Sequence, residues 1–600
     1  MQSQGLLCSP TICITALVLW LARLTASDGM FESLTNDYLD SSSNPVQLNY
    51  GVAVSDVDND GTMEWIVAGY SGANLVLKWD AASNKLYNIA VNDKNSPFYA
   101  LRDTQGNAIG VSACDVDGDG REEIYFLNTN NAYSGYATYT DKLFKFRDGK
   151  YVDLFQDEVN KDAIRLYAGR SVACVDRKGT GRYSIVVANY ASGNVGPFGL
   201  IEMVVEDSDV AAGHIVLRDV ASEAGVARLT GGRGVTVGPI MNDFGLSDIF
   251  CDNERGANFL FVNQGDGSFE DVAQKSDIAD RRENGRGVAL TDLNGDELID
   301  IVYGNWEGPH RIYIQEKNGE DRRFRDIATA PYRNPSPIRT VIVADFDNDG
   351  NLEILQNNIV HGDYAPNHVF RVTRNETGKD PKVEEIDIGD AEEPDGFGTG
   401  GAVADLDGDG VLELMLSHGE SSRQPLTMYR AKTNGDENWL RVMPKTEHGA
   451  PARGALVVAR TTDNVAHLRV IDGGSGYLCQ MEPVAHFGLG SAIVSRVEIT
   501  WPDSQKMVKI IDKMNSVIVI EHPKNSNSSS KDTGGVLGDK LVDKELPEVK
   551  VEGELMHEES QRHKDIVHDH NGKSSTFNDP RRSLRIVLSM FVVLMSSSVL

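Results

Sequence analysis

One short loop between two apolar runs has the clearest chemistry in the sequence. Asp115, Asp117 and Asp119 alternate along it, and Glu123 follows four residues later. Carboxylates at positions 1, 3, 5 and 9 of a tight loop point their oxygens at one centre, and they repel each other unless a hard cation lies among them. Ligation by oxygen alone favours Ca²⁺. Gly120 at position 6 allows the backbone to reverse and return position 9 to that centre.

The flanks of this loop distinguish it from an EF-hand. An EF-hand loop joins two helices and closes with a Glu at position 12. Here the set of ligands closes at position 9, and both flanks are short and rich in β-branched or aromatic residues, which is typical of strands. The sequence therefore predicts a strand–loop–strand unit.

The same pattern recurs along the chain, in five complete copies and two degraded ones. The first positions of the seven loops are Asp56, Asp115, Asp176, Ile240, Asp292, Asp345 and Asp405. Successive first positions are 52 to 64 residues apart, and each interval holds several short apolar runs. A repeat of this length with several strands predicts one blade of a β-propeller, so seven repeats predict seven blades.

In each complete loop, side-chain oxygens at positions 1, 3, 5 and 9 and the backbone carbonyl at position 7 form a nearly complete ligand shell. The candidate Ca²⁺ ligands are Asp56, Asp58, Asp60, Thr62 and Glu64; Asp115, Asp117, Asp119, Arg121 and Glu123; Asp292, Asn294, Asp296, Leu298 and Asp300; Asp345, Asp347, Asp349, Asn351 and Glu353; and Asp405, Asp407, Asp409, Val411 and Glu413. A catalytic metal would keep an open position beside a general base. The expected role of the ions is therefore structural, and no catalytic residues are assigned.

The two degraded loops predict blades that hold their shape without metal. In the third repeat Lys178 replaces a ligand Asp, so its ammonium is expected where a cation would lie. In the fourth repeat Ile240 and Phe244 replace two carboxylates, so that loop is expected to close by packing.

A short motif near the N-terminus predicts how the ring closes. Phe31-Glu-Ser-Leu-Thr resembles the pentapeptides that start at Leu217, Phe269 and Phe324, each of which reads as the outermost strand of a blade. The N-terminal copy has no blade before it, and the last blade lacks its own copy. Residues 31–35 should therefore complete the blade of residues ~400–435, which removes an exposed sheet edge.

The repeat stops at Trp439, and residues 438–523 contain β-type runs joined by Gly-rich turns, which predicts a small β-sandwich. Its distinctive pieces are Gly473-Gly-Ser-Gly-Tyr477 and His486-Phe-Gly-Leu-Gly490. A Gly-rich loop can cradle phosphate, but that role needs a following helix N-terminus, and none is predicted. Both pieces are therefore interpreted as structural turns.

The repeats resemble the FG-GAP/VCBS type of integrin α-subunit propellers. Asn438-Trp-Leu, the two Gly-rich pieces and Val497-Glu-Ile-Thr-Trp-Pro502 resemble the ASPIC/UnbV module. Together they are similar to the cartilage acidic protein family over residues ~30–523. The resemblance implies an all-β fold: a seven-bladed FG-GAP/VCBS β-propeller (residues 27–437), an ASPIC/UnbV β-sandwich (residues 438–523) and a disordered tail. It also implies an extracellular calcium-binding protein in adhesion, or a receptor ligand or antagonist.

The chain departs from that family in one respect. The familiar vertebrate form carries a Cys-rich, EGF-like calcium module after the ASPIC/UnbV part, whereas no cysteine follows Cys479 here. Residues 524–583 are instead rich in Ser, Asp, Glu and Lys, which predicts a disordered linker. The apolar run in residues 584–600 is too short for a comfortable membrane span and matches a glycolipid (GPI) anchor signal. The alternatives are a weak tail anchor or a plain hydrophobic terminus.

Several features predict secretion. Residues 1–26 have the apolar core and small terminal residue of a signal peptide. Asn375 and Asn527 head glycosylation sequons. Cys114 and Cys174 precede equivalent loops of successive repeats and should lie on neighbouring inner strands, so they either form a disulfide or remain buried thiols.

The charge and the motifs limit the function. The net charge of −31 argues against nucleic acid as a partner, although bound metal would neutralise part of it. The leading hypothesis is an extracellular, non-enzymatic module that binds an extracellular or cell-surface protein and is stabilised by Ca²⁺. The alternative is an extracellular glycan-active enzyme on a propeller scaffold. That enzyme would need a catalytic set outside the metal loops, and the sequence has no nucleophile elbow and no His-Glu-x-x-His motif.

Overall fold

The computed structural model describes residues 29–129, 134–362 and 364–526. The predicted signal peptide, Asn527 and the predicted anchor segment lie outside the described residues, as does the linker beyond residue 526. The helices within these ranges are all short: α2 (Thr35–Tyr38), α3 (Pro523–Ser526), η1 (Tyr99–Arg102), η3 (Leu154–Gln156), η4 (Glu158–Asn160), η5 (Val205–Asp207) and η6 (Asp390–Glu392). Within the described ranges, no helix has the length and apolar character needed to cross a membrane.

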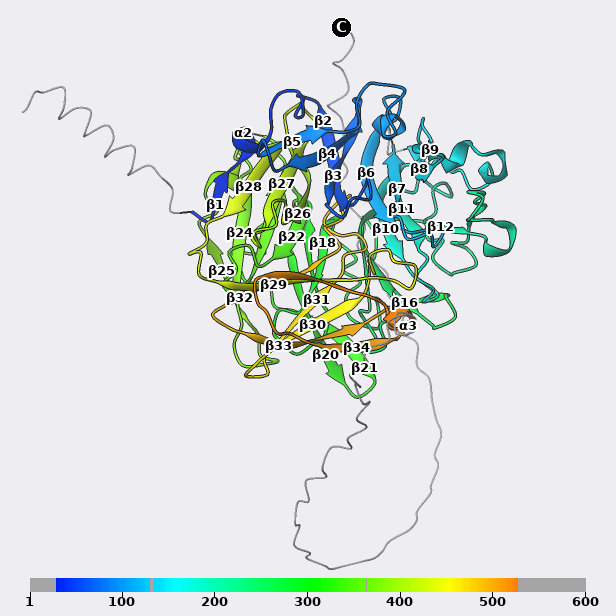
Figure 1. Cartoon of the computed structure of the whole chain (residues 1–600). Coiled ribbons are helices and arrows are strands. Elements are labelled where there is room, and N and C mark those ends of the chain that lie inside the picture. The colour runs from blue at the N-terminus through cyan, green and yellow to red at the C-terminus, as the bar shows by residue number, and fades with distance from the viewer. Residues whose placement is uncertain (1–28, 130–133, 363, 527–600) are drawn as a thin grey trace, which may run out of the picture. The chain divides into compact units, whose positions relative to one another are not determined.

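Seven four-stranded antiparallel sheets form the blades of a β-propeller, as the sequence predicts (Figure 1). In chain order they are β2 (Leu48–Ser55), β3 (Glu64–Tyr70), β4 (Leu75–Asp80) and β5 (Lys85–Asn88); β6 (Ala108–Cys114), β7 (Glu123–Asn128), β8 (Lys142–Arg147) and β9 (Lys150–Asp153); β10 (Gly169–Val175), β11 (Ser184–Asn189), β12 (Gly199–Met203) and β13 (Leu217–Asp219); β14 (Gly231–Gly238), β15 (Asp248–Glu254), β16 (Phe259–Asn263) and β17 (Phe269–Asp271); β18 (Gly285–Thr291), β19 (Asp300–Asn305), β20 (Arg311–Asn318) and β21 (Asp321–Asp326); β22 (Ile338–Ala344), β23 (Leu352–Asn358), β24 (His368–Thr373) and β25 (Lys382–Ile386); and β26 (Gly398–Ala404), β27 (Glu413–His418), β28 (Thr427–Ala431) and β1 (Phe31–Ser33).

The first strand of each blade faces the centre of the ring. Each of these inner strands packs against the inner strand of the next blade, and β26 of the last blade packs against β2 of the first. The second strands are buried along almost their whole length, for example all six residues of β7. Continuous apolar runs suit this position because both faces of a blade are covered by its neighbours.

The N-terminal strand closes the ring, as the Phe31 motif predicts. Strand β1 pairs antiparallel with β28, with Phe31 opposite Ala431 and Ser33 opposite Tyr429. The pairing is visible in Figure 1, where the blue β1 lies beside the yellow-green β28. The Phe31 side chain is 1% exposed and meets Phe346 of the sixth blade edge to face, with 5.1 Å between ring centroids. The last blade is therefore built from both ends of the propeller sequence.

The C-terminal module (residues 438–520) is a two-sheet β structure with its own apolar core. Its strands are β29 (Asn438–Pro444), β30 (Leu456–Thr461), β31 (Ala466–Val470), β32 (Ala485–Gly490), β33 (Val494–Thr500), β34 (Lys506–Ile510) and β35 (Ser516–Ile520). The interpretation of His486–Gly490 as a turn is wrong, since this piece forms β32 and pairs with β29. The pairing buries Phe487 and Leu489 in the module core, so Gly488 between them is a strand residue.

The other Gly-rich piece belongs to a loop that lies within the ring of inner strands. This channel loop (residues 473–480) exchanges backbone hydrogen bonds with Val288 of β18 through Gly476, at 2.7 and 2.8 Å. Gly473 accepts from Cys174 of β10, and Gln480 donates to Val52 of β2. A Cβ on Gly474 would lie 2.4 Å from the Cβ of Ala173, so the inner strands approach too closely for a side chain there.

Cys114 at the end of β6 and Cys174 in β10 form a disulfide between neighbouring inner strands. The two cysteines are 60 residues apart in sequence. Cys251 and Cys479 are buried free thiols. Of the two alternatives that the sequence leaves open for the pair, the structure has the disulfide.

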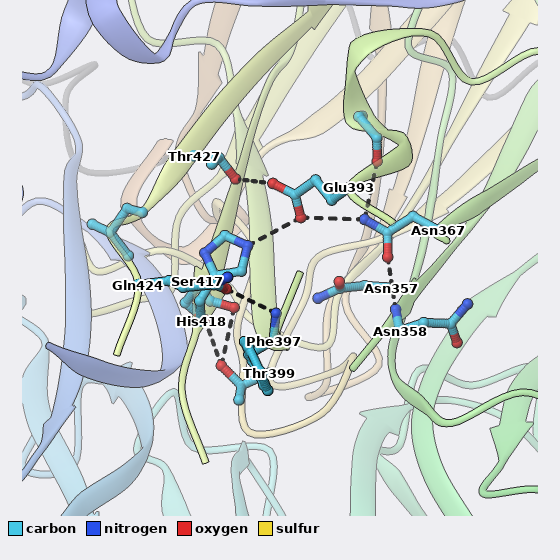
Figure 2. Close-up of polar contacts among 12 residues, drawn as sticks. Asn357, Asn358, Asn367, Glu393, Phe397, Thr399, Ser417, His418, Gln424 and Thr427 are labelled. Carbon is cyan, nitrogen blue, oxygen red and sulfur yellow. Dashed lines mark hydrogen bonds and ion pairs between the residues drawn. The ribbon is translucent and has the colours of Figure 1, made fainter. Parts of the chain in front are cut away.

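A buried polar network fastens the segment between the sixth and seventh blades (Figure 2). The Glu393 carboxylate accepts hydrogen bonds from the hydroxyls of Thr427 and Tyr429, at 2.5 and 2.6 Å. His418 Nε2 lies 3.0 Å from the same carboxylate, and His418 Nδ1 lies 2.8 Å from the carbonyl oxygen of Pro425. Because both ring nitrogens face acceptors, both must carry protons, and the pair is imidazolium with carboxylate. Burial acts to lower the His418 pKa, but Glu393 outweighs burial and raises it.

This network predicts a pH dependence of stability. A histidine with a raised folded-state pKa contributes stability that is complete below its ordinary value of 6.5 and is lost as the pH rises through the folded value. Glu393→Gln should cost about 3–5 kcal/mol, because it removes the partner of a buried charge. It should also flatten the decline of stability above pH 6.5. Chemical unfolding at a series of pH values measures both effects.

The matched control is Glu392→Gln, which changes the exposed neighbouring carboxylate. Its stability and its pH profile should follow the wild type. A Glu393→Gln profile that runs parallel to the wild type above pH 6.5 would show that His418 is neutral in the folded protein.

Candidate metal sites in the acidic loops

Each acidic loop joins the end of an inner strand to the start of the second strand, so all of these loops lie at one end of the propeller. The same hydrogen bonds shape them. In the second blade Asp115 accepts from the backbone N–H of Gly120 at 2.9 Å, and Glu123 accepts from that of Val116 at 2.9 Å. Gly120 has φ +90°, which a side chain would disfavour. Asp119 accepts from the N–H of Arg121 at 3.0 Å, so position 7 closes the turn.

The structure brings the predicted ligands together in four of the five complete loops. In each, three carboxylates offer oxygens that all lie within 4.8 Å of one another. These groups are Asp56, Asp58 and Glu64; Asp115, Asp117 and Asp119; Asp345, Asp347 and Glu353; and Asp405, Asp407 and Glu413.

The loop of the fifth blade differs. Among the described residues, its carboxylates do not converge as those of the other four loops do. Asp292 accepts from the N–H groups of Gly295 and Glu297, and Asp300 accepts from those of Leu293 and Gln315. The convergent loops make equivalent bonds, but here Asn294 replaces a carboxylate at position 3, so the loop has three ligand carboxylates instead of four and is the weakest of the five candidates.

Each of the four convergent loops also receives a basic side chain from the third strand of its own blade, a feature that the sequence analysis missed. In the second blade Lys145 Nζ lies 2.6 Å from both Asp117 and Asp119 and 3.1 Å from Glu123. The corresponding residues in the first, sixth and seventh blades are Lys78, Arg371 and Arg430. The recurrence of a basic residue in the middle of the third strand was the signal that could have revealed it.

The same third-strand position differs in the remaining blades. In the fifth blade the register places Ile314 there, which is apolar and buried. In the third blade the charges are reversed: Glu202 stands on the strand, and it pairs with Lys178 at 3.2 Å and with Arg177 at 2.8 Å. The Lys178 ammonium therefore faces a carboxylate of its own blade.

In the fourth blade the expectation of closure by packing is half right. Ile240 is fully buried in an apolar cluster, whereas Phe244 is 64% exposed. Hydrogen bonds from Asn242 to Leu246 and to Asp248 close the loop instead.

Burial strongly disfavours charge on these carboxylates. It raises the pKa of Asp115 to about 7 and that of Glu64 to about 7. It raises the pKa of Asp345 to about 8. In each case burial is the largest cause of the rise, and the neighbouring carboxylates contribute to it. A nearby cation stabilises the charged form of a carboxyl group, and this stabilisation matters most where burial and neighbouring carboxylates disfavour that form.

The donor sets fit a divalent ion. Each convergent loop holds four carboxylates at positions 1, 3, 5 and 9 against one basic third-strand side chain, so a large negative charge remains. Asp58 Oδ1 and Asp345 Oδ1 are buried and have no hydrogen-bond partner. Buried anionic oxygens without a partner are costly, and a hard cation with oxygen ligands satisfies them. If Ca²⁺ is the ion, the residues named for these four loops would hold it.

The acidic end of the propeller also carries the C-terminal module. Arg441 of β29 lies 3.0 Å from Asp405 in the loop of the seventh blade. Arg453, which is 0% exposed, pairs with Glu122 at position 8 of the second blade's loop at 2.6 Å. A change in the geometry of these loops should therefore be transmitted to the C-terminal module through Arg441 and Arg453.

Two other candidate features have a simple place in the structure. Asn375 is exposed on the connection between β24 and β25, where its amide donates to the carbonyl of Asp380 at 2.6 Å. The Glu393–His418 pair has the residue types of a catalytic dyad, but its polar atoms are engaged with each other and with Thr427, Tyr429 and Pro425.

Comparison with known proteins agrees with the two-part architecture. The model of the "ASPIC and UnbV" family matches residues 445–527, and the "FG-GAP-like repeat" model matches residues 241–303 and 292–355. Among solved structures, the BP39L lectin of Burkholderia pseudomallei aligns with a TM-score of 0.39 and 11% identity, over 64% of this chain and 96% of the lectin.

Two curated relatives match over most of their length. Human cartilage acidic protein 1 is 59% identical over 522 residues, which cover 85% of this chain and 79% of the relative. Cartilage acidic protein 1 of Xenopus tropicalis is 58% identical over 513 residues, which cover 84% of this chain and 79% of the relative. On this similarity, the chain belongs to the cartilage acidic protein 1 family.

Proposed function

We propose that this chain is an extracellular, non-enzymatic binding protein whose propeller is stabilised by Ca²⁺ in the acidic loops. The observation that carries the proposal is the convergence of buried carboxylates in four loops, with more negative charge in each than one basic side chain neutralises. When bound, Ca²⁺ would supply the missing positive charge and coordinate the unpartnered oxygens. The propeller and the C-terminal module would then present surfaces to an extracellular or cell-surface protein.

The role of the ions would be structural. Each loop supplies its own carboxylates, and these already accept the backbone N–H groups that shape the turn. Extracellular modules of this kind bind Ca²⁺ at about 10⁻⁴–10⁻³ M, which suits an extracellular protein. The expected signal peptide in residues 1–26 fits secretion, and the C-terminal apolar run in residues 584–600 fits attachment through a GPI anchor.

A rigid docking arrangement supports a binding function. The channel loop and the contacts of Arg441 and Arg453 hold the C-terminal module against the propeller. A surface that is already ordered loses less entropy when a partner binds. The strong net negative charge disfavours nucleic acid and anionic membrane as that partner.

Removal of metal tests the calcium part of the proposal. Excess EDTA should lower the melting temperature of the wild type, and added Ca²⁺ should restore it. Asp345→Asn replaces an expected Ca²⁺ ligand of the sixth loop with an amide of the same size, so this variant should lose less stability to EDTA than the wild type does. Thermal unfolding followed by circular dichroism measures both. Asp380→Asn, outside the loops and on an exposed ion pair, is the matched control.

Removal of the internal basic residue tests whether metal and lysine act on the same charges. Lys145→Gln should cost about 3–5 kcal/mol in EDTA, because it leaves Asp117, Asp119 and Glu123 without their counter-charge. Saturating Ca²⁺ should recover most of that loss. A variant that is equally destabilised with and without Ca²⁺ would rule out an ion in this loop.

Capture of a partner tests the binding part. Tagged protein that covers residues 27–526 should retain the same cell-surface protein from repeated extracts in the presence of Ca²⁺, and retain less of it in EDTA. Quantitative mass spectrometry of the eluates, compared with a tagged unrelated propeller, measures the enrichment. Eluates that match the unrelated propeller in both buffers would contradict a protein-binding role.

A further inference from the structure

A cavity of about 910 Å³ lies at the end of the propeller opposite the acidic loops. Its walls are the first residues of inner strands and the last residues of second strands, from Tyr50 at the start of β2 to Glu420 just after β27. Inner strands run from this cavity to the acidic loops, which places the two at opposite ends. Tyr477 and Leu478 of the channel loop also line it. The channel loop thus reaches from the module to the far end of the ring.

Four arginines occupy the same place in four successive blades around this cavity. Arg170, Arg233, Arg286 and Arg339 stand near the start of the inner strands of blades three to six, and all four line the cavity. Each is 6–8% exposed.

A local irregularity of the strands accompanies every one of these arginines. The register of the inner strand shifts between Gly169 and Ser171, Gly232 and Val235, Gly285 and Val288, and Ile338 and Thr340. Such shifts re-aim side chains. The inner strands of the other three blades have the same shift without an arginine, so the fold sets the direction of the side chain and the sequence of blades three to six supplies the arginine.

The cavity is lined by fewer carboxylates than arginines. Five arginines and three glutamates line the cavity. Arg233 and Arg286 share one carboxylate, Glu254, with Arg233 Nε at 2.9 Å and Arg286 Nη2 at 3.1 Å from it. Arg339 Nε donates to Glu420 at 3.0 Å, while Arg339 Nη1 is buried and has no hydrogen-bond partner. Positive charge therefore remains in an otherwise acidic protein.

The buried arginines lie close enough together to repel one another. Burial, together with the charges of Arg233 and Arg339, lowers the pKa of Arg286 to about 9. The Arg286 and Arg339 guanidinium carbons lie 5.4 and 4.0 Å from the ring centroid of Trp306. The aromatic ring relieves part of the repulsion but supplies no anion.

We propose that this cavity binds a compact ligand with two or more anionic oxygen groups, carboxylate or sulfate, up to about the size of a disaccharide. Guanidinium groups recognise such groups by paired hydrogen bonds, and the cavity volume is typical of sites for small molecules. The net charge of −31 repels a long polyanion outside the cavity, which favours a compact anion. The site is independent of Ca²⁺ and of a protein partner, so it goes beyond the function proposed above.

Isothermal titration calorimetry tests the site with three probes: inorganic sulfate, citrate and a disulfated disaccharide. Ionic strength is held constant with sodium chloride. At least one probe should bind wild-type protein with 1:1 stoichiometry, and the same probe should raise the melting temperature above that in chloride alone. The probe that binds most tightly identifies the ligand chemistry as simple oxyanion, polycarboxylate or sulfated sugar.

Two variants and a control locate the binding. Arg286→Gln and Arg339→Gln should each weaken the best probe at least tenfold. Arg325→Gln removes an exposed arginine that pairs with Glu316 and Asp380 outside the cavity, and it should bind as the wild type does. Arg286→Gln also relieves repulsion, so it should unfold at or above the wild-type temperature without ligand. This variant remains informative even if Arg339→Gln does not fold.

Three results would overturn the proposal. The first is the absence of heat and of any melting shift beyond chloride with all three probes. The second is binding that Arg286→Gln leaves unchanged. The third is equal weakening by Arg286→Gln and Arg325→Gln, which would indicate a general effect of surface charge.

Discussion

The structure depends on how the blades compensate the buried carboxylates of their inner-to-second-strand loops. The turn from the inner to the second strand is shaped by carboxylates that accept backbone N–H groups, as Asp115 and Glu123 do. This geometry forces anions together where water cannot screen them. The blades answer the same problem in different ways. Lys145 and its counterparts bring a positive charge, the third blade exchanges the signs between Lys178 and Glu202, and the fourth replaces charge with amide hydrogen bonds. In the blades that use Lys145 or one of its counterparts, a divalent ion would supply further positive charge.

The two ends of the propeller carry opposite chemistry, and the C-terminal module connects them. Its arginines, such as Arg441, face the carboxylates of the acidic end. Its channel loop continues between the inner strands until Tyr477 lines the arginine-rich cavity. Acidic and basic ends of one ring are thereby linked by a single Gly-rich loop. Its glycines are needed because the inner strands leave no room for side chains, as at Gly474.

The sequence predicts the fold well because its signals are local and repeat seven times. The alternation of carboxylates after an apolar run fixes the strand–loop–strand unit, and the orphan Phe31 motif predicts which strand closes the ring. The errors and omissions are contacts between side chains on different strands, blades or modules. Arg233 and Arg286 meet at one carboxylate because the fourth and fifth blades pack side by side, and the depth reached by the channel loop depends on how the module docks. His486–Gly490 was misread because its glycines suggest a turn, while pairing with β29 makes it a strand.

The most direct test of the account is a crystal structure grown in millimolar Ca²⁺, with anomalous diffraction to locate the ions. The account predicts anomalous peaks within the loops that start at Asp56, Asp115, Asp345 and Asp405, in contact with the carboxylate oxygens that converge there. It would be contradicted by loops without peaks in which Lys78, Lys145, Arg371 and Arg430 alone occupy the space among the carboxylates.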